Sequence, residues 1–376
     1  MERPRVTFTQ ESHDKSEDAA SLPTLDGQGS SRDRRSSDKG RRRSKESKRG
    51  AEEDDAPAYY DSRASTQFEY RRRATTLREY YAANPDLLPQ LPFTLRHGWR
   101  RTKIGLMALA ILFDTCIVPI ILYYAMTVAS GVKGWITFAV MSSLWGGLTY
   151  VEFAARSFRL IKPERFYRPI GIKDNRWTFD STHYVFIVAI TAVTALLIVG
   201  SAPHDPFVRV LAMPGPALLY CFAIPIFLET IWYMKDWKAP FRISSTGKGE
   251  AVRPGVYYII EDIIAVDGNA GRPFREGIDA RYEASLRFRL LMRNISLFWS
   301  IPALIVAIVC TALVCVHEVK KEVAYGLGWG IPFAFATIWG LATTPIVQRE
   351  LDKEEREWEI EHGKDTASGP KEAAMA

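Results

Sequence analysis

The chain has 376 residues, a formal net charge of +6 at neutral pH and a mean hydropathy of −0.10. These averages combine charged segments with apolar blocks of about 18 to 24 residues, the length that crosses a hydrocarbon layer of about 30 Å. The distribution excludes a soluble protein with ordinary cores and predicts an all-α integral membrane protein. Because the lysines and arginines lie mainly in the polar loops, we expect no nucleic-acid partner.

The cysteines and acidic motifs do not predict a metal, a cofactor or a disulfide framework. All four cysteines fall inside the apolar blocks, where small packed side chains are the natural interpretation. The motif Asp267-Gly268-Asn269 lacks the ligand spacing of a calcium loop. No nucleophile with a plausible base, no zinc-protease motif and no dinucleotide fingerprint occurs in the chain. The catalytic and metal sets are therefore predicted to be empty.

Residues 1–66 form a tail rich in Ser, Asp, Glu, Lys and Arg, and this composition predicts disorder. Paired arginines precede hydroxyl groups here and just beyond, the pattern that basophilic kinases favour, so a kinase is a candidate partner. Chance also supplies such sites in a tail of this composition, and a plain solvated tail remains the alternative. The candidate phosphorylation sites are Ser36, Ser37, Ser44 and Thr75.

A cytosolic juxtamembrane segment over 67–103 is expected to hold a basic, aromatic helix at 67–83 that ends at Asn84-Pro85. With no cleavable signal ahead of it, the first span directs insertion. Six spans are then predicted, four of them within 104–235 and two within 295–347. They are 104–127, 135–155, 182–200, 215–234, 295–316 and 324–347.

The charges of the loops predict the orientation of these spans. Short loops at 128–134, 201–214 and 317–323 carry few cations, whereas the other polar segments are rich in Lys and Arg. By the positive-inside rule both termini are cytosolic. The plasma membrane and the endomembranes are not distinguished.

The charged C-terminal tail, 348–376, is expected to continue the sixth span as a helix. Lys353 and Glu357 lie four residues apart on it, and Gly363 is expected to stop it.

The cytosolic insert 236–294 is the most structured of the polar segments. Pro254 suits a first helical position, and the apolar residues that follow recur at helical spacing on a stripe opposite Glu261 and Asp262. A second helical run follows Gly271. The members of the stripe are Val256, Ile259, Ile260, Ile263 and Ile264.

We expect the stripe to lie against the membrane or to cap the cytosolic ends of the spans, with Trp and Tyr at headgroup depth. An independent soluble subdomain is the alternative. If the stripe lies against the membrane or caps the spans, basic side chains of the insert would face anionic headgroups or a protein partner. They are Arg242, Lys248, Arg253, Arg272, Arg275, Arg287, Arg289 and Arg293.

Ionisable side chains inside a bilayer are functional candidates because their insertion costs about 2.5 to 3.5 kcal/mol. Asp114, Glu152, His183 and Glu229 are the candidates, and most lie toward the cytosolic half. They predict either a proton or cation path or ordinary packing contacts. In the packing alternative, Glu229 pairs with a nearby cation such as Arg156, and Asp114 bonds one of the two hydroxyls in the third span, Thr191 or Thr194.

Small residues four apart predict close helix packing in two spans. They are Gly326, Gly330 and Ala334 in the sixth span and Ala139, Ser143 and Gly147 in the second.

The segments DWKAPFRISSTGKGEAVRPGVYYIIEDIIAVDG and GRPFREGIDARYEAS resemble multi-pass membrane proteins of unassigned function from filamentous fungi, over about residues 95 to 350. This resemblance implies no activity. The run at 252–258 also loosely resembles an Arg-His-Pro element of membrane-embedded isoprenylcysteine carboxyl methyltransferases. The histidine of that element is absent, and no catalytic residue carries over.

Three functions follow, in order of preference. The first is a non-enzymatic membrane protein whose basic, aromatic cytosolic surface engages anionic lipid or a partner protein. The second is a transporter or channel for a small solute or cation that uses the intramembrane carboxylates. The third is a membrane-bound transferase.

Overall fold

The computed structural model describes residues 77–91, 100–144, 147–161, 166–171 and 179–368. The chain divides into two units, Met1–Ala58 and Tyr59–Ala376, and every described residue belongs to the second. The N-terminal tail predicted to be disordered, with its candidate phosphorylation sites, lies outside the described residues.

The described residues form an all-α fold, as predicted, and the protein is a membrane protein. Backbone pairing of the β type in this part of the chain is confined to two isolated β-bridges, Lys238 with Ala251 and Ile243 with Thr246. Five helices are long and apolar enough to cross a bilayer. They are Gly105–Ala129, Ser181–Ser201, Pro214–Met234, Leu286–Cys315 and Lys321–His362.

The first span is continuous but not uniformly α-helical. Helix α4 (Arg100–Leu112) leads into a π-helical turn η1 (Phe113–Ile117), helix α5 (Val118–Tyr123) and a second π turn η2 (Tyr124–Ala129). Pro119 lies at the start of α5 and cannot donate a backbone hydrogen bond to the preceding turn, which suits the wider turn before it.

The second predicted span is divided between two shorter helices. Helix α6 covers Gly134–Leu144 and α7 covers Gly147–Ile161, on either side of residues 145–146. Each has fewer than the roughly 17 residues needed to cross a bilayer as one helix. This segment is therefore not among the five spanning helices.

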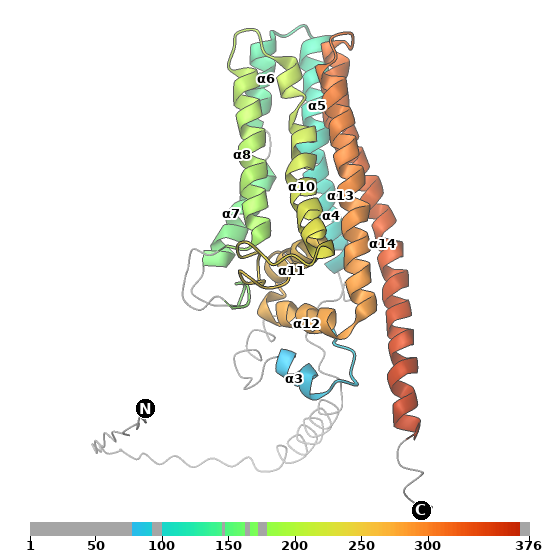
Figure 1. The fold of residues 1–376 in the computed structure, drawn as a ribbon. Coiled ribbons are helices and arrows are strands. Elements are labelled where there is room, and N and C mark those ends of the chain that lie inside the picture. The colour runs from blue at the N-terminus through green and yellow to red at the C-terminus, as the bar shows by residue number, and fades with distance from the viewer. Residues whose placement is uncertain (1–76, 92–99, 145–146, 162–165, 172–178, 369–376) are drawn as a thin grey trace, which may run out of the picture. The chain divides into compact units, whose positions relative to one another are not determined.

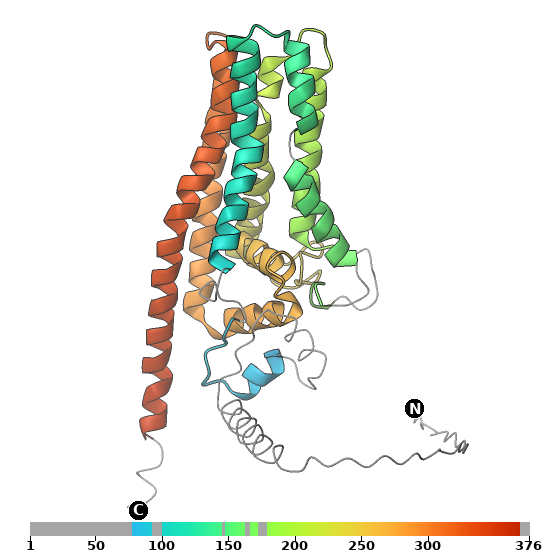
Figure 2. The ribbon, with the colours of Figure 1, turned by 180° about the vertical axis from the view of Figure 1, so that it is seen from behind.

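The remaining long helices pack side by side (Figures 1 and 2). Helix α8 (Ser181–Ser201) lies against α10 (Pro214–Met234), which also contacts α13 (Leu286–Cys315) and α14 (Lys321–Ser368). The short helix α9 (Val208–Leu211) closes the connection between α8 and α10.

Helix α14 corrects two sequence predictions. It continues through Gly363 to Ser368, so this glycine does not stop it. Lys353 pairs with Glu350 at 2.7 Å, three residues before it, and not with Glu357. A single glycine costs a helix only about 1 kcal/mol, which the surrounding helical residues tolerate.

Two helices of the insert, α11 (Gly255–Val266) and α12 (Gly271–Ala284), lie below the lower ends of α8 and α10 and beside the lower part of α13 in the view of Figure 1. The backbone N–H of Gly255 donates to Thr230 Oγ1 of α10 (3.2 Å), and that of Val256 donates to Ser296 Oγ of α13 (3.0 Å). The first backbone donors of α11 are thus satisfied by side chains of two spanning helices. The start of α11 is therefore joined to two of the long helices, and the described residues of the insert belong to the same compact unit as these helices.

A short helix, α3 (Leu77–Ala83), packs on α12. It ends before Asn84, as predicted, while the first part of the predicted helix lies outside the described residues. The Leu77 N–H donates to Glu276 Oε2 at 3.2 Å.

The close backbone contact in the spans is made by glycines other than the expected pairs. A Cβ on Gly328 would lie 2.1 Å from the carbonyl oxygen of Ala212, and one on Gly215 would lie 2.2 Å from the carbonyl oxygen of Gly328. Gly330 and Gly147 have open space at that position. Gly326 is limited by the Tyr124 hydroxyl at 2.6 Å, so of these three predicted glycines it alone makes a close contact.

We predict that Gly328→Ala lowers stability by about 1 to 3 kcal/mol, because the new methyl group meets a backbone carbonyl that cannot rotate away. Gly330→Ala, two residues along the same helix, is the matched control and should leave the midpoint of thermal unfolding unchanged or slightly raised. Thermal unfolding of the detergent-solubilised proteins measures both. Equal midpoints for the two variants would contradict this packing.

Candidate functional site

Arg275 of α12 is completely buried and lies at the centre of a group of carboxylates. Its Nη1 donates to Asp262 Oδ1 (2.6 Å) and Glu261 Oε1 (2.9 Å) of α11. Its Nη2 donates to Asp180 Oδ2 (3.4 Å), the residue before α8, and to the Tyr167 carbonyl (3.3 Å). One guanidinium thus joins three separate segments of the chain.

A second buried arginine, Arg156 of α7, approaches the same group from another side. Its Nη2 donates to both oxygens of Asp180, at 2.8 and 2.7 Å, and its Nη1 donates to Asp267 at the end of α11. The fork geometry of a guanidinium suits such two-oxygen contacts. The expected pairing of Arg156 with Glu229 is therefore wrong. We call Arg156, Asp180, Glu261, Asp262, Asp267 and Arg275 the buried ion cluster.

Hydroxyl and amide groups at the start of α8 complete the cluster. Asp262 Oδ2 accepts from the Thr182 N–H (3.1 Å), from Thr182 Oγ1 (2.9 Å) and from Ser181 Oγ (3.2 Å). The Ser244 hydroxyl donates to the same oxygen. Asp180 is the N-cap of α8 and accepts from the His183 N–H at 2.8 Å. The first turn of α8 is therefore fixed by hydrogen bonds to two carboxylates of the cluster, Asp180 and Asp262.

Negative charge exceeds positive charge in the cluster, with four carboxylates against two guanidiniums. Burial raises the pKa of Glu261 to about 7 and that of Asp180 to about 6. The neighbouring charge of Asp262 raises both further, while the arginines oppose the shift. The two guanidiniums of the cluster, with Arg159 3.9 Å from Asp267 at its edge, do not neutralise all four acids. The cluster therefore retains a proton close to neutral pH.

Several buried polar atoms at the cluster have no hydrogen-bond partner among the described residues. They include Glu261 Oε2, Arg275 Nε and Arg156 Nε. His183 Nδ1 is also without one, and its ring stacks between Phe153 (4.9 Å) and Phe179 (4.5 Å). Spare donors and acceptors of this kind suit the exchange of a proton. No group of three or more metal-ligating side chains occurs in the described ranges.

The intramembrane candidates occupy different environments. Glu229, in the last turns of α10, lies near enough to Asp262 for their charges to interact. Asp114, on η1, has one buried carboxylate oxygen without a hydrogen bond in the described part of the chain. The expected contact with a third-span hydroxyl is wrong, because Thr194 bonds Tyr150 (2.8 Å) and Thr191 is exposed. Glu152 is half-buried on α7.

The acidic face of α11 is buried, and Val256 of the predicted apolar stripe is buried as well. Glu261 and Asp262 are each 0% exposed, whereas Ile263 is 36% exposed. Ile259, Ile260 and Ile264 are only partly buried, at the edge of the core. The helical spacing placed these carboxylates opposite the apolar stripe but could not reveal that Arg275 of α12 pairs with both of them.

Most of the arginines predicted to face lipid contact the protein instead. Arg275 is buried, and Arg253 binds Asp279 and Glu283. Arg287 binds Glu350 and Glu357 of α14. Arg272 pairs with Glu276, and Arg242 donates to the carbonyls of Ile170 and Ser244. Arg293 donates to Asn294, and Arg289 is half-buried. Lys248 is the one exposed side chain of the eight.

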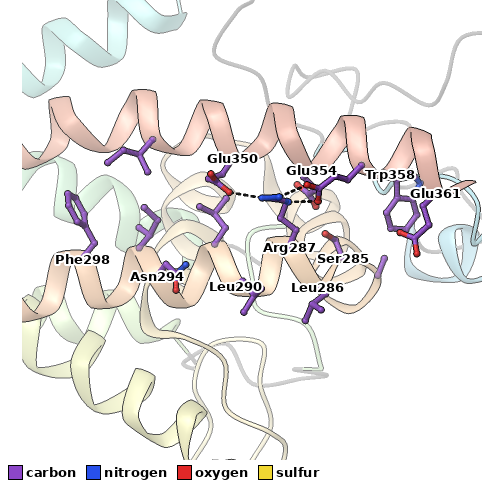
Figure 3. Close-up of a pocket in the computed structure, with 15 residues that line it drawn as sticks. Ser285, Leu286, Arg287, Leu290, Asn294, Phe298, Glu350, Glu354, Trp358 and Glu361 are labelled. Atoms are coloured by element: carbon purple, nitrogen blue, oxygen red, sulfur yellow. Dashed lines mark hydrogen bonds and ion pairs between the residues drawn. The ribbon is translucent and has the colours of Figure 1, made fainter.

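A groove of about 820 Å³ runs between α13 and α14, away from the ion cluster (Figure 3). Its walls carry Leu290 and Phe298 from α13 and Ile346 from α14. Arg287 crosses the groove to Glu350 of α14 at 2.9 Å.

Comparison with known proteins gives the family of this chain. Residues 79–358 match the model of a family described as "Domain of unknown function (DUF8766)". The protein belongs to this family. The matched part includes most of α3, the whole buried ion cluster and most of α14. No curated protein and no solved structure matches the chain. The resemblance to fungal multi-pass membrane proteins stays a prediction.

Sequence reasoning named Arg156 and Glu261 but missed Asp180 and the central role of Arg275. A usable signal existed for Asp180, because an Asp directly before a Ser-Thr pair and an apolar run is a typical N-cap. No local signal places Arg275 beside Glu261, because the pairing is made between two helices.

We predict that Arg275→Gln destabilises this DUF8766 protein by about 3 to 5 kcal/mol, because it leaves buried carboxylates without their cation. Arg272→Gln, on the same helix, removes a partly exposed pair with Glu276 and should cost at most about 1 kcal/mol. Unfolding midpoints of both variants in detergent test the difference. A loss for Arg272→Gln as large as that for Arg275→Gln would contradict the central role of Arg275.

The raised pKa values predict how stability depends on pH. The folded state holds a proton on Glu261 up to about pH 7, whereas the unfolded chain releases it near pH 4.5. The extra stability is therefore present at low pH and is lost as the pH rises through about 7. We expect a decrease of about 1 to 3 kcal/mol between pH 5 and 8. Glu261→Gln should flatten this dependence, and an unchanged slope in that variant would contradict the assignment.

Proposed function

We propose that this protein is a non-enzymatic, six-span membrane protein with both termini in the cytosol, and that its insert engages anionic lipid headgroups. The cations concentrated in alternate loops support this orientation. Helices α6 and α7 together supply the sixth crossing, since their combined length suits one span with an interruption.

The lipid contact is assigned to the loop that joins α10 to α11, residues 235–254. Large apolar side chains are exposed in this loop and at the end of α10 just before it: Trp237 is 57% exposed and Phe241 59%, and Met234 of α10 is 51% exposed. This is the observation that carries the proposal. The loop begins where a spanning helix ends, at the depth where amphipathic aromatic rings settle. At the membrane surface these exposed apolar side chains would be removed from water. If the loop lay in the aqueous phase, they would stay in contact with water.

The charge of the same loop favours anionic lipid. It holds Lys235, Lys238, Arg242, Lys248 and Arg253 against Asp236 and Glu250, a balance of five minus two, or +3. The three lysines are exposed, and each cation near an anionic surface contributes about 1 kcal/mol. The exposed cations that can contact lipid are thus lysines, while most arginines of the insert contact other groups of the protein.

The loop is held in shape by its own hydrogen bonds. The Ala239 N–H donates to the Glu250 carbonyl (2.8 Å), and the Ile243 and Thr246 backbones bond reciprocally at 3.0 and 2.9 Å. The side chain of Ile243, a residue of this loop, is buried in the insert core and anchors the loop there. Its exposed aromatic side chains are therefore presented with little loss of conformational freedom on binding.

The N-terminal tail completes the proposal as a segment under kinase control. Its support is the pairing of arginines with following hydroxyls, and this part of the proposal concerns residues outside the described structure.

The orientation predicts where an added glycosylation acceptor is modified. An Asn-X-Ser site placed in the 201–207 segment should be glycosylated on membrane insertion, because that loop would face the lumen. A site placed in 244–250 should remain unmodified. Modification at the second position with none at the first would overturn the proposed topology.

Replacing Lys235, Lys238 and Lys248 by Gln should weaken the preference for anionic over zwitterionic lipid, by about 1 kcal/mol for each lysine. Native mass spectrometry of the full chain with two lipids of equal chain length measures this preference. Lys133→Gln, at an exposed lysine between η2 and α6, is the control and should have no effect. An unchanged preference in the triple variant would remove the lipid assignment.

A further inference from the structure

The groove between α13 and α14 has an apolar floor and an open side. It begins at the α12–α13 junction and follows α13 from Leu286 to Phe298, about 18 Å, and α14 from Ile346 to Glu361, about 23 Å, at 1.5 Å per residue. Leu286 and Leu290 are exposed in it, although both are large and apolar. An apolar strip of this length between two parallel walls is a surface suited to a further helix.

Acidic side chains line the α14 wall of the groove. Glu350, Glu354, Glu357 and Glu361 all face it, against the single lining cation Arg287 (Figure 3). Arg281 neutralises Glu354 at 2.7 Å and Lys353 approaches Glu350 at 2.7 Å, so four acids meet three cations and an acidic excess of one remains.

The wider surface of α14 strengthens this acidity. Over residues 348–362, seven Asp and Glu stand against three Lys and Arg, a balance of −4. A ligand that entered the groove would therefore meet a negative potential at its acidic rim and an apolar surface beneath.

We propose that this groove binds a basic amphipathic helix of a partner protein. Apolar side chains at every third or fourth position of that helix would pack on Leu286, Leu290 and Phe298. Lysines or arginines beside this stripe would meet Glu361 and also Glu357, which Arg287 already pairs with from α13. The length of the groove corresponds to about four helical turns, enough for four such apolar contacts.

Charge and length together favour a helix over a lipid. An anionic headgroup is repelled by the glutamates, which distinguishes this surface from the lysine-bearing loop at the end of α10. The part of the groove between Leu286 and Leu290 also lies beside the acids of α14, whereas an acyl chain is most stable in the hydrocarbon layer. The inference goes beyond the proposed lipid contact and does not depend on it.

The test uses the full chain in nanodiscs of zwitterionic lipid, so that a basic peptide is not drawn to the membrane itself. The probe is a fluorescently labelled Leu and Lys peptide with helical spacing, about five turns long. A peptide with Glu in place of Lys is its matched partner, and empty nanodiscs give the background. We expect saturable binding of the first peptide alone, measured by fluorescence anisotropy and weakened by salt.

Variants locate the binding surface. The double variant Glu357→Gln with Glu361→Gln should weaken binding about fivefold to tenfold. The matched control is Glu355→Gln with Glu359→Gln, two exposed acids of the same helix that do not line the groove, and it should bind like the native chain. Leu290→Gln should also weaken binding by removing an apolar contact. Size-exclusion profiles confirm that each variant is folded.

Three outcomes would overturn the inference. They are no saturable binding, equal binding of the acidic peptide, and equal losses in the groove and control variants. A single-chain cationic amphiphile that binds saturably where the peptide does not would assign the groove to a small amphipathic cation and also overturn the helix assignment.

Discussion

The arrangement of the insert depends on one interaction, the enclosure of Arg275 by carboxylates from other segments. A guanidinium without contact to water is stable only where acids and hydrogen-bond acceptors surround it. Asp180, Glu261 and Asp262 provide these groups from two directions in the chain. Arg156 then holds Asp180 from α7. The cluster consequently fixes α7, α8, α11 and α12 with respect to one another.

This constraint explains why the insert is part of the helix assembly and not a separate domain. Helix α11 turns its carboxylates inward because their partners lie there, and its isoleucines are left at the edge of the core. Its first N–H groups are satisfied by hydroxyls of α10 and α13. Charge pairing and capping thus hold α11 in place together with apolar burial, and the proton shared in the cluster makes that attachment sensitive to pH.

The distribution of charge outside the cluster separates two surfaces of opposite character. Exposed lysines and aromatic side chains gather on the loop after α10, while acids gather along α14. Many arginines between them are bound to acids of the protein itself, as Arg253 and Arg287 are. The net charge of the insert therefore says little about what it binds. The proposed lipid and helix contacts both follow from the side chains that remain exposed.

The sequence alone determined the membrane class, the all-α fold and the existence of most helices, because these depend on the local length and period of apolar runs. It also placed the insert helices within one residue of their starts, since Pro254 and Gly271 act locally. Only the tertiary structure decided that Glu261 is buried, that Arg275 is its partner and that Gly328 is the tight glycine. These are contacts between residues of different elements, and a periodic pattern shows which residues share a face but not which element will cover it.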